Sequence, residues 1–180
     1  MTNPVDTHLL QQDYFTLFGL VADFNLPLQT LEAHYRALQK QTHPDQFATQ
    51  ADAAKRLSLQ WATHINHAHQ TLKSPLSRAR YLLKLRGVDT AEESNTAMPM
   101  DFLLEQLEWR ERIGDAKKSR DIHQLEKIAD DLQSMEQALI ANLTHELQQQ
   151  HNDAAAISVR KLRFLDKLDE EIGDAIESSL

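Results

Sequence analysis

Apolar residues recur along this chain at steps of three and four positions, which is the spacing of one face of an α-helix. Two such stretches, residues 28–42 and 51–72, lie on either side of His43-Pro44-Asp45. A proline cannot continue a helix, and it pushes the residue before it out of the α region. The pattern therefore predicts a helical hairpin that displays an imidazole and a carboxylate at its turn. A plainer interpretation is that Pro44 only ends the first helix and His43 caps it.

The two helices of this hairpin are expected to be apolar on the faces that meet. The apolar positions of the first are Leu28, Leu31, Tyr35 and Leu38. Those of the second are Ala54, Leu57, Trp61, Ile65, Ala68 and Leu72. Arg36 and Lys40 fall on the opposite side of the first helix, so that helix is predicted to be apolar inside and basic outside.

Glycine, proline and serine set the ends of this first module. The apolar and aromatic segment Asp13 to Leu20 contains Gly19 and is predicted to form a short helix or turn that covers the hairpin core. Ser74-Pro75 is typical of an N-cap followed by proline at the first helical position, and Gly87 is typical of a helix stop. A further helix is therefore expected over 76–86.

Three longer amphipathic stretches follow, and they predict a second module. The first, residues 100–113, is expected to stop near Gly114; the others cover 122–147 and 154–176. Consecutive helices with short connections are typical of an antiparallel three-helix bundle. Because the chain has only 4 Gly and 5 Pro and no sustained strand-like alternation, the predicted fold class is all-α.

The predicted domain boundaries follow from these elements. Residues 1–87 form the first module, with a core at 13–75 behind a polar N-terminal extension. Residues 88–98 lack periodicity and collect polar side chains, so they are predicted to be a linker. Residues 99–180 form the bundle.

The charge of the chain argues against nucleic acid and membranes as partners. Its formal net charge is -8, of which -1 falls before Pro75 and -7 from Pro75 onward. Such a chain repels phosphate backbones and anionic lipid surfaces. It has no signal-like apolar segment and no apolar run long enough to span a bilayer. We therefore expect a cytoplasmic protein.

Metal and cofactor chemistry is not predicted. The chain has no Cys, which excludes thiolate ligands and thiol nucleophiles. His64, His67 and His69 are close in sequence but do not converge on one helical face, so solvated positions are the expectation. His43 and Asp45 on an exposed turn lack a nucleophile and a pocket, which argues against an enzyme.

The first bundle helix carries two apolar sectors. Phe102, Trp109 and Ile113 lie together on one side. A second sector, edged with acid, contains Leu103, Leu104, Leu107, Glu108 and Glu111. This second sector is either an exposed docking surface or a wide core contact with both neighbouring helices. Phe164 on the last helix either extends that surface or lies at the edge of the core.

Several of these segments together carry a family resemblance. Asp13 to Leu20, the basic-faced helix, the His43-Pro44-Asp45 turn and the stretch from Ile65 to Leu72 look like a J domain. The bundle segments 102–108 and 160–168 resemble the HscB family, the J-type co-chaperones of iron-sulfur cluster assembly. The resemblance covers nearly the whole chain from Asp13 onward. Gln46 departs from the pattern, since many J domains have a lysine after the tripeptide.

The resemblance implies a co-chaperone that stimulates ATP hydrolysis by a DnaK-class chaperone, HscA in bacteria, and brings it the iron-sulfur scaffold IscU. The implied chaperone-binding residues are Arg36, Lys40, His43, Pro44 and Asp45. The implied scaffold-binding residues are Leu103, Leu104, Leu107, Glu108, Glu111 and Phe164. A J protein that delivers a different folding client is the alternative.

Overall fold

The computed structural model describes residues 10–47, 51–90, 92 and 98–178, and within these ranges every regular element is helical. The start of the predicted N-terminal extension, residues 1–9, and most of the predicted linker, at 91 and 93–97, lie outside the described residues. The chain divides into two compact units, Met1–Leu82 and Leu83–Leu180. The division falls inside helix α4 (Pro75–Leu85), a few residues before Gly87.

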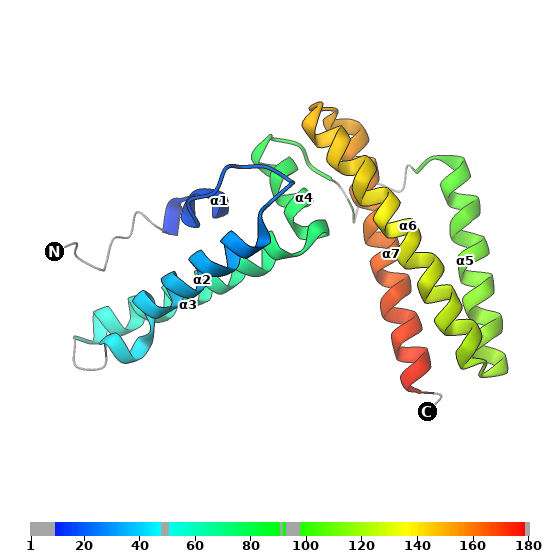
Figure 1. Cartoon of the computed structure of the whole chain (residues 1–180), viewed down its shortest axis with the longest axis horizontal. Helices are drawn as coiled ribbons and strands as arrows, with labels where there is room; N and C mark the ends of the chain where they lie inside the picture. Colours follow the sequence, from blue (N-terminus) through cyan, green and yellow to red (C-terminus); the bar gives the residue numbers. More distant parts are fainter. Residues whose placement is uncertain (1–9, 48–50, 91, 93–97, 179–180) are drawn as a thin grey trace. The chain divides into compact units, whose positions relative to one another are not determined.

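The first unit is built around a helical hairpin. Helix α2 (Leu28–Thr42) and helix α3 (Asp52–Lys73) lie side by side and run in opposite directions, joined through the 3-10 turn η2 (Pro44–Phe47) (Figure 1). The short helix α1 (Tyr14–Leu17) packs against α3. The predicted hairpin is confirmed, and its helix ends agree with the predicted ones to within one residue.

Local caps explain where these helices begin and end. The Asp13 side chain accepts hydrogen bonds from the backbone N–H groups of Phe15 and Thr16, both at 3.0 Å, and so caps α1. The backbone N–H of Ser77 donates to Ser74 Oγ at 3.3 Å, as predicted for the start of α4. Gly87 has φ +76°, the left-handed conformation that suits glycine after a helix.

The core of the first unit follows the predicted stripe on α3, with one error on α2. Trp61, Ile65, Ala68 and Leu72 are all buried. On α2, Leu31 is buried, but Leu28 is 46% exposed, so its predicted place in the core is wrong. Leu28 is the first residue of the helix, where the end of the hairpin leaves it fewer neighbours.

The second unit is the predicted antiparallel three-helix bundle. Helices α5 (Met100–Ser119), α6 (Ile122–Gln148) and α7 (Asn152–Glu177) alternate in direction (Figure 1), and α6 packs most extensively on α7. The interior consists of the predicted apolar positions, among them Leu125, Ile128, Leu143, Leu162, Leu165 and Ile172.

The predicted stop at Gly114 is wrong, because α5 continues through it to Ser119. Glycine inside a helix costs only about 1 kcal/mol relative to alanine, and burial of Ile113 and Ala116 on both sides of it offsets that cost. The helix ends instead at Arg120, whose φ is +52°. Asp121 then caps α6 by accepting a hydrogen bond from the Gln124 backbone at 3.0 Å.

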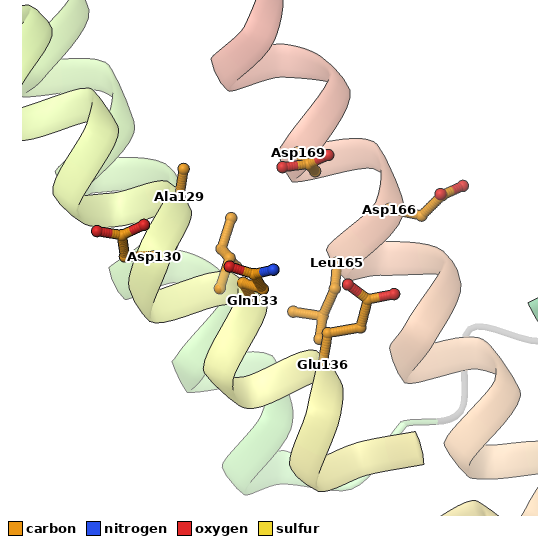
Figure 2. Close-up of a pocket in the computed structure, with 8 residues that line it drawn as sticks. Ala129, Asp130, Gln133, Glu136, Leu165, Asp166 and Asp169 are labelled. Carbon is orange, nitrogen blue, oxygen red and sulfur yellow. The ribbon is translucent and has the colours of Figure 1, made fainter. Parts of the chain in front are cut away.

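An acidic groove of about 360 Å³ runs between α6 and α7. Its polar lining includes Asp130, Gln133, Glu136, Asp166 and Asp169 (Figure 2). Leu132 and Leu165 are among its apolar lining residues. Partial burial, together with the charges of Asp169 and Asp166, raises the pKa of Glu136. Ionising Glu136 therefore costs more in the folded bundle than in the unfolded chain.

We expect Glu136→Gln to stabilise the protein at neutral pH. The pKa of Glu136 is raised on folding, so its contribution to stability is present at acidic pH and is lost as pH rises through the folded pKa. A neutral amide avoids this loss and should raise the thermal midpoint at pH 7 by about 1 °C, a small effect because Glu136 is exposed and solvent screens its interactions. This increase in the thermal midpoint should vanish when the same melts are run near pH 4. Glu170→Gln, an exposed change on α7, is the control, and an equal gain there would contradict the explanation.

Candidate functional site

The tripeptide sits at the turn of the hairpin, between the end of α2 and η2. His43 has φ -57° and ψ 131°, so its backbone has left the α region as the following proline requires. Its Nδ1 atom accepts a hydrogen bond from the Asp45 backbone N–H at 3.3 Å and lies 3.5 Å from Asp45 Oδ2. These contacts hold the imidazole against the turn. The Asp45 side chain is 89% exposed, so its carboxylate is open to a cation of another molecule.

A cavity of about 600 Å³ lies beside this turn and joins it to the basic face of α2. Its lining includes Arg36, Gln39, Lys40, His43, Asp45 and Asn66. Arg36 and Lys40 are exposed, and within the described part of the chain neither is paired with a carboxylate. Arg36, Lys40, His43 and Asp45 thus line one cavity at the turn, where Asp45 lies close to His43 and stays exposed.

The histidines of α3 do not all lie in solvent as predicted. His69 is only 3% exposed, and its Nε2 atom is 3.0 Å from Glu32 Oε1 on α2. That hydrogen bond is the largest cause of a lowered pKa at Glu32, with the Lys73 ammonium 3.6 Å away adding to it. The expectation of a solvated His69 is wrong, because its partner is 37 residues away in sequence and comes close only in the hairpin.

His64 and His67 instead face α1. The Tyr14 ring lies edge-on to both, at 5.6 and 5.7 Å between ring centres. Burial and the neighbouring His67 lower the pKa of His64. Among the described residues, no group of three or more His, Cys, Asp or Glu side chains is arranged to hold a metal ion.

On α5, the two predicted apolar sectors differ in burial. Phe102 and Ile113 are each 1% exposed and Trp109 is 8% exposed, so this sector faces the bundle core. In the second sector Leu104 is 57% and Leu107 65% exposed, Leu103 is half-buried, and Glu108 and Glu111 are exposed. The interpretation of this sector as a wide core contact is therefore wrong for Leu104 and Leu107. They form an exposed apolar stripe with acidic neighbours.

Met100 belongs to the same stripe and was not predicted from the sequence. It is 71% exposed and lies one helical turn before Leu103 and Leu104. The signal that could have identified it is the spacing itself, since positions 100, 103, 104 and 107 share one face of a helix. We refer to Met100, Leu103, Leu104 and Leu107, with Glu108 and Glu111, as the leucine stripe.

Phe164 is at the edge of the core, not on the exposed stripe. It is 9% exposed, and its ring meets the Phe102 ring edge-on with 5.6 Å between centres. The Arg110 guanidinium lies over its ring at 5.8 Å. Of the two places predicted for Phe164, the edge of the core is the one observed, and its ring contacts α5 through Phe102.

In the described ranges, none of the helices combines the length and the apolar character needed to cross a bilayer.

A hairpin with a displayed His-Pro-Asp turn and a basic helix, followed in sequence by a three-helix bundle, defines the class of J-domain co-chaperones. Comparison with known proteins narrows this class. A family model described as the HSCB C-terminal oligomerisation domain matches residues 98–173. The co-chaperone protein HscB homolog of Burkholderia thailandensis is 48% identical over 168 residues, which cover 93% of this chain and 96% of that protein.

Two solved structures are similar over most of their length. Chaperone HscB from Vibrio cholerae has a TM-score of 0.82 at 37% identity, covering 94% of this chain and 100% of that one. Human co-chaperone protein HscB has a TM-score of 0.85 at 28% identity, and the match covers 90% of this chain and 81% of that one. The chain belongs to the HscB family of J-domain co-chaperones, which act in iron-sulfur cluster assembly. The resemblance stated from the sequence is confirmed.

Proposed function

We propose that this co-chaperone stimulates the ATPase of a DnaK-class chaperone of the HscA type and delivers to it an iron-sulfur scaffold protein of the IscU type. The observation that carries the proposal is that one chain presents two separate exposed surfaces. One is the exposed Asp45 carboxylate beside Arg36 and Lys40, for which the described ranges hold no carboxylate partner. The other is the leucine stripe on α5.

The first surface suits an ATPase partner with both acidic and basic groups. Exposed Arg36 and Lys40 attract an acidic surface at long range, which raises the association rate. Asp45 then meets a cation of the ATPase, and that ion pair becomes strong only once the contact excludes water. In this proposal His43 and Pro44 hold the carboxylate at the apex of the turn.

The second surface suits a protein client. Leu104 and Leu107 are 57% and 65% exposed and form an apolar patch on the helix surface, and the acidic residues Glu108 and Glu111 flank them. An apolar centre with a charged rim is the usual anatomy of a protein interface. A scaffold with an apolar patch edged by basic groups is the expected complement.

In this proposal the protein is not itself an enzyme. ATP hydrolysis takes place in the chaperone, and the co-chaperone acts by binding the state of the chaperone that hydrolyses ATP fastest. The residues around the tripeptide then need no nucleophile, metal or cofactor of their own.

The direct test is steady-state ATP hydrolysis by the cognate chaperone, measured with and without this protein and with and without the scaffold. We expect stimulation by the co-chaperone alone, and greater stimulation when the scaffold is present. A chaperone whose rate does not change would contradict the ATPase proposal. Stimulation that the scaffold does not affect, with another client recovered in a pull-down, would favour a J protein with a different client.

A further inference from the structure

Apolar burial on α2 is concentrated near the start of the helix, away from the tripeptide. Helix α2, all of whose residues are described, buries only Leu31, and that residue lies in its first turn. Tyr35 and Leu38 are half-buried, and the remaining positions up to Thr42 are at most partly covered. Apolar burial alone therefore holds the second half of α2 less firmly than its start.

A set of polar side chains crosses from α2 to α3 along the hairpin, from Glu32 near the start of α2 to Gln39 in its second half. The Tyr35 hydroxyl donates to Asn66 Oδ1 at 2.9 Å, and Gln39 Nε2 donates to the Tyr35 hydroxyl at 2.6 Å. The Tyr35 ring stacks on the His69 ring with 3.9 Å between centres and 10° between planes. His69 in turn is bonded to Glu32 at 3.0 Å. We call Glu32, Tyr35, Gln39, Asn66 and His69 the polar clamp.

The polar clamp is continuous with the candidate chaperone-binding surface. Gln39 and Asn66 line the cavity of about 600 Å³ that also contains Arg36, Lys40 and Asp45. Gln39 lines this cavity beside Arg36 and Lys40, so the bonds that fix its side chain also shape the cavity wall next to the two cations. Tyr35 is the centre of the polar clamp, because its hydroxyl bonds both amides and its ring contacts His69.

We propose that the polar clamp is a positioning device for chaperone activation, an inference that rests on the proposed ATPase stimulation. It fixes the rotation and register of α2 on α3. In doing so it fixes the direction in which Arg36 and Lys40 are presented relative to the Asp45 carboxylate. A partner that must meet the basic face and the turn together binds best when their mutual geometry is set in advance. Without the polar clamp, binding itself has to order the two surfaces.

The test removes one hydroxyl and no packing volume. Tyr35→Phe keeps the ring on His69 but loses both hydrogen bonds of the hydroxyl. We expect the co-chaperone concentration for half-maximal ATPase stimulation to rise about three- to tenfold, the usual net effect of a hydrogen bond. The maximal stimulated rate should stay unchanged because Asp45 is intact. Tyr14→Phe, which removes a hydroxyl on α1 away from the polar clamp, is the matched control and should leave both quantities unchanged.

A double-mutant cycle separates positioning from a general loss of stability. Asn66→Leu and Tyr35→Phe both remove the Tyr35–Asn66 bond, and each also removes one bond from Gln39, so the double variant should be clearly less impaired than the sum of the two single ones. Tyr35→Phe and Lys40→Ala should instead be additive. All assays are run below the thermal midpoints of the variants. If Asn66→Leu does not fold, the Tyr35→Phe result decides alone.

The outcomes distinguish this inference from the function on which it rests. If the unaltered protein stimulates normally and Tyr35→Phe has the same half-maximal concentration, the proposed role of the polar clamp is overturned and the proposed function stands. No stimulation by the unaltered protein would overturn the proposed function and the inference with it. A lower maximal rate at an unchanged half-maximal concentration would also overturn positioning, because it would place Tyr35 in the trigger itself.

Discussion

Asp45→Asn is expected to abolish stimulation of the chaperone ATPase. The substitution keeps the size and shape of the side chain and removes only its negative charge. In the proposed complex this charge meets a cation of the ATPase, and loss of one partner of such a desolvated pair typically costs about 2–5 kcal/mol, or roughly 30-fold to several thousand-fold in binding. ATP hydrolysis measured over a range of co-chaperone concentrations should therefore stay near the basal rate.

The fold should be unaffected by this change. The Asp45 side chain is 89% exposed, and the bond from its backbone N–H to His43 does not depend on the carboxylate. Asp52→Asn is a matched control, since that aspartate is 85% exposed at the start of α3 and makes only a loose surface pair with Lys55 at 3.8 Å. Full stimulation by Asp45→Asn, or an equal loss with Asp52→Asn, would refute the role assigned to Asp45.

The combined change Leu104→Ala with Leu107→Ala should weaken scaffold binding by about 30- to 1000-fold. Each leucine loses three carbon atoms of side chain, and an anchor residue of this kind contributes roughly 1–2 kcal/mol when it is buried in an interface. Alanine has a high helix propensity, so α5 should remain helical. Isothermal titration of the scaffold into each variant measures the dissociation constant directly.

Two controls make this result specific. Leu59→Ala on α3 removes an equally exposed leucine, at 56%, from the other unit and should leave scaffold affinity unchanged. Leu143→Ala removes a fully buried leucine from the bundle and should lower stability by about 2–5 kcal/mol. Unchanged affinity for the Leu104 and Leu107 variant would place the client site elsewhere on the chain. Basal ATPase stimulation without scaffold should be unaffected, because the tripeptide is intact.

The elements of this protein were predictable because their signals are local. A proline after a periodic helix fixes the end of α2 through the sterics of adjacent residues, and the spacing of apolar positions fixes which face of α3 is buried. The exposed stripe on α5 was predictable in part for the same reason, since one apolar sector is enough for a core. Whether the second sector was exposed could not be decided until the packing of α6 and α7 was known.

Two of the errors have a common cause. Gly114 looked like a stop because glycine disfavours helix, but burial on either side of it outweighed the local preference. His69 looked like a solvated position because imidazole is polar, yet it is buried in the hairpin and bonded to Glu32 on α2. In both cases a contact with another helix overrode a correct local tendency.

The sequence by itself determined the helices, the tripeptide at the turn, the basic face and the family, because each is encoded in short-range spacing or in residue identity. Only the tertiary structure decided which of these residues meet. The His69–Glu32 bond joins positions 37 residues apart, and the Tyr35–Asn66 bond joins positions 31 apart. No periodicity carries such pairings, since they depend on the rotation of one helix against another. That rotation is set by the packing of the whole hairpin.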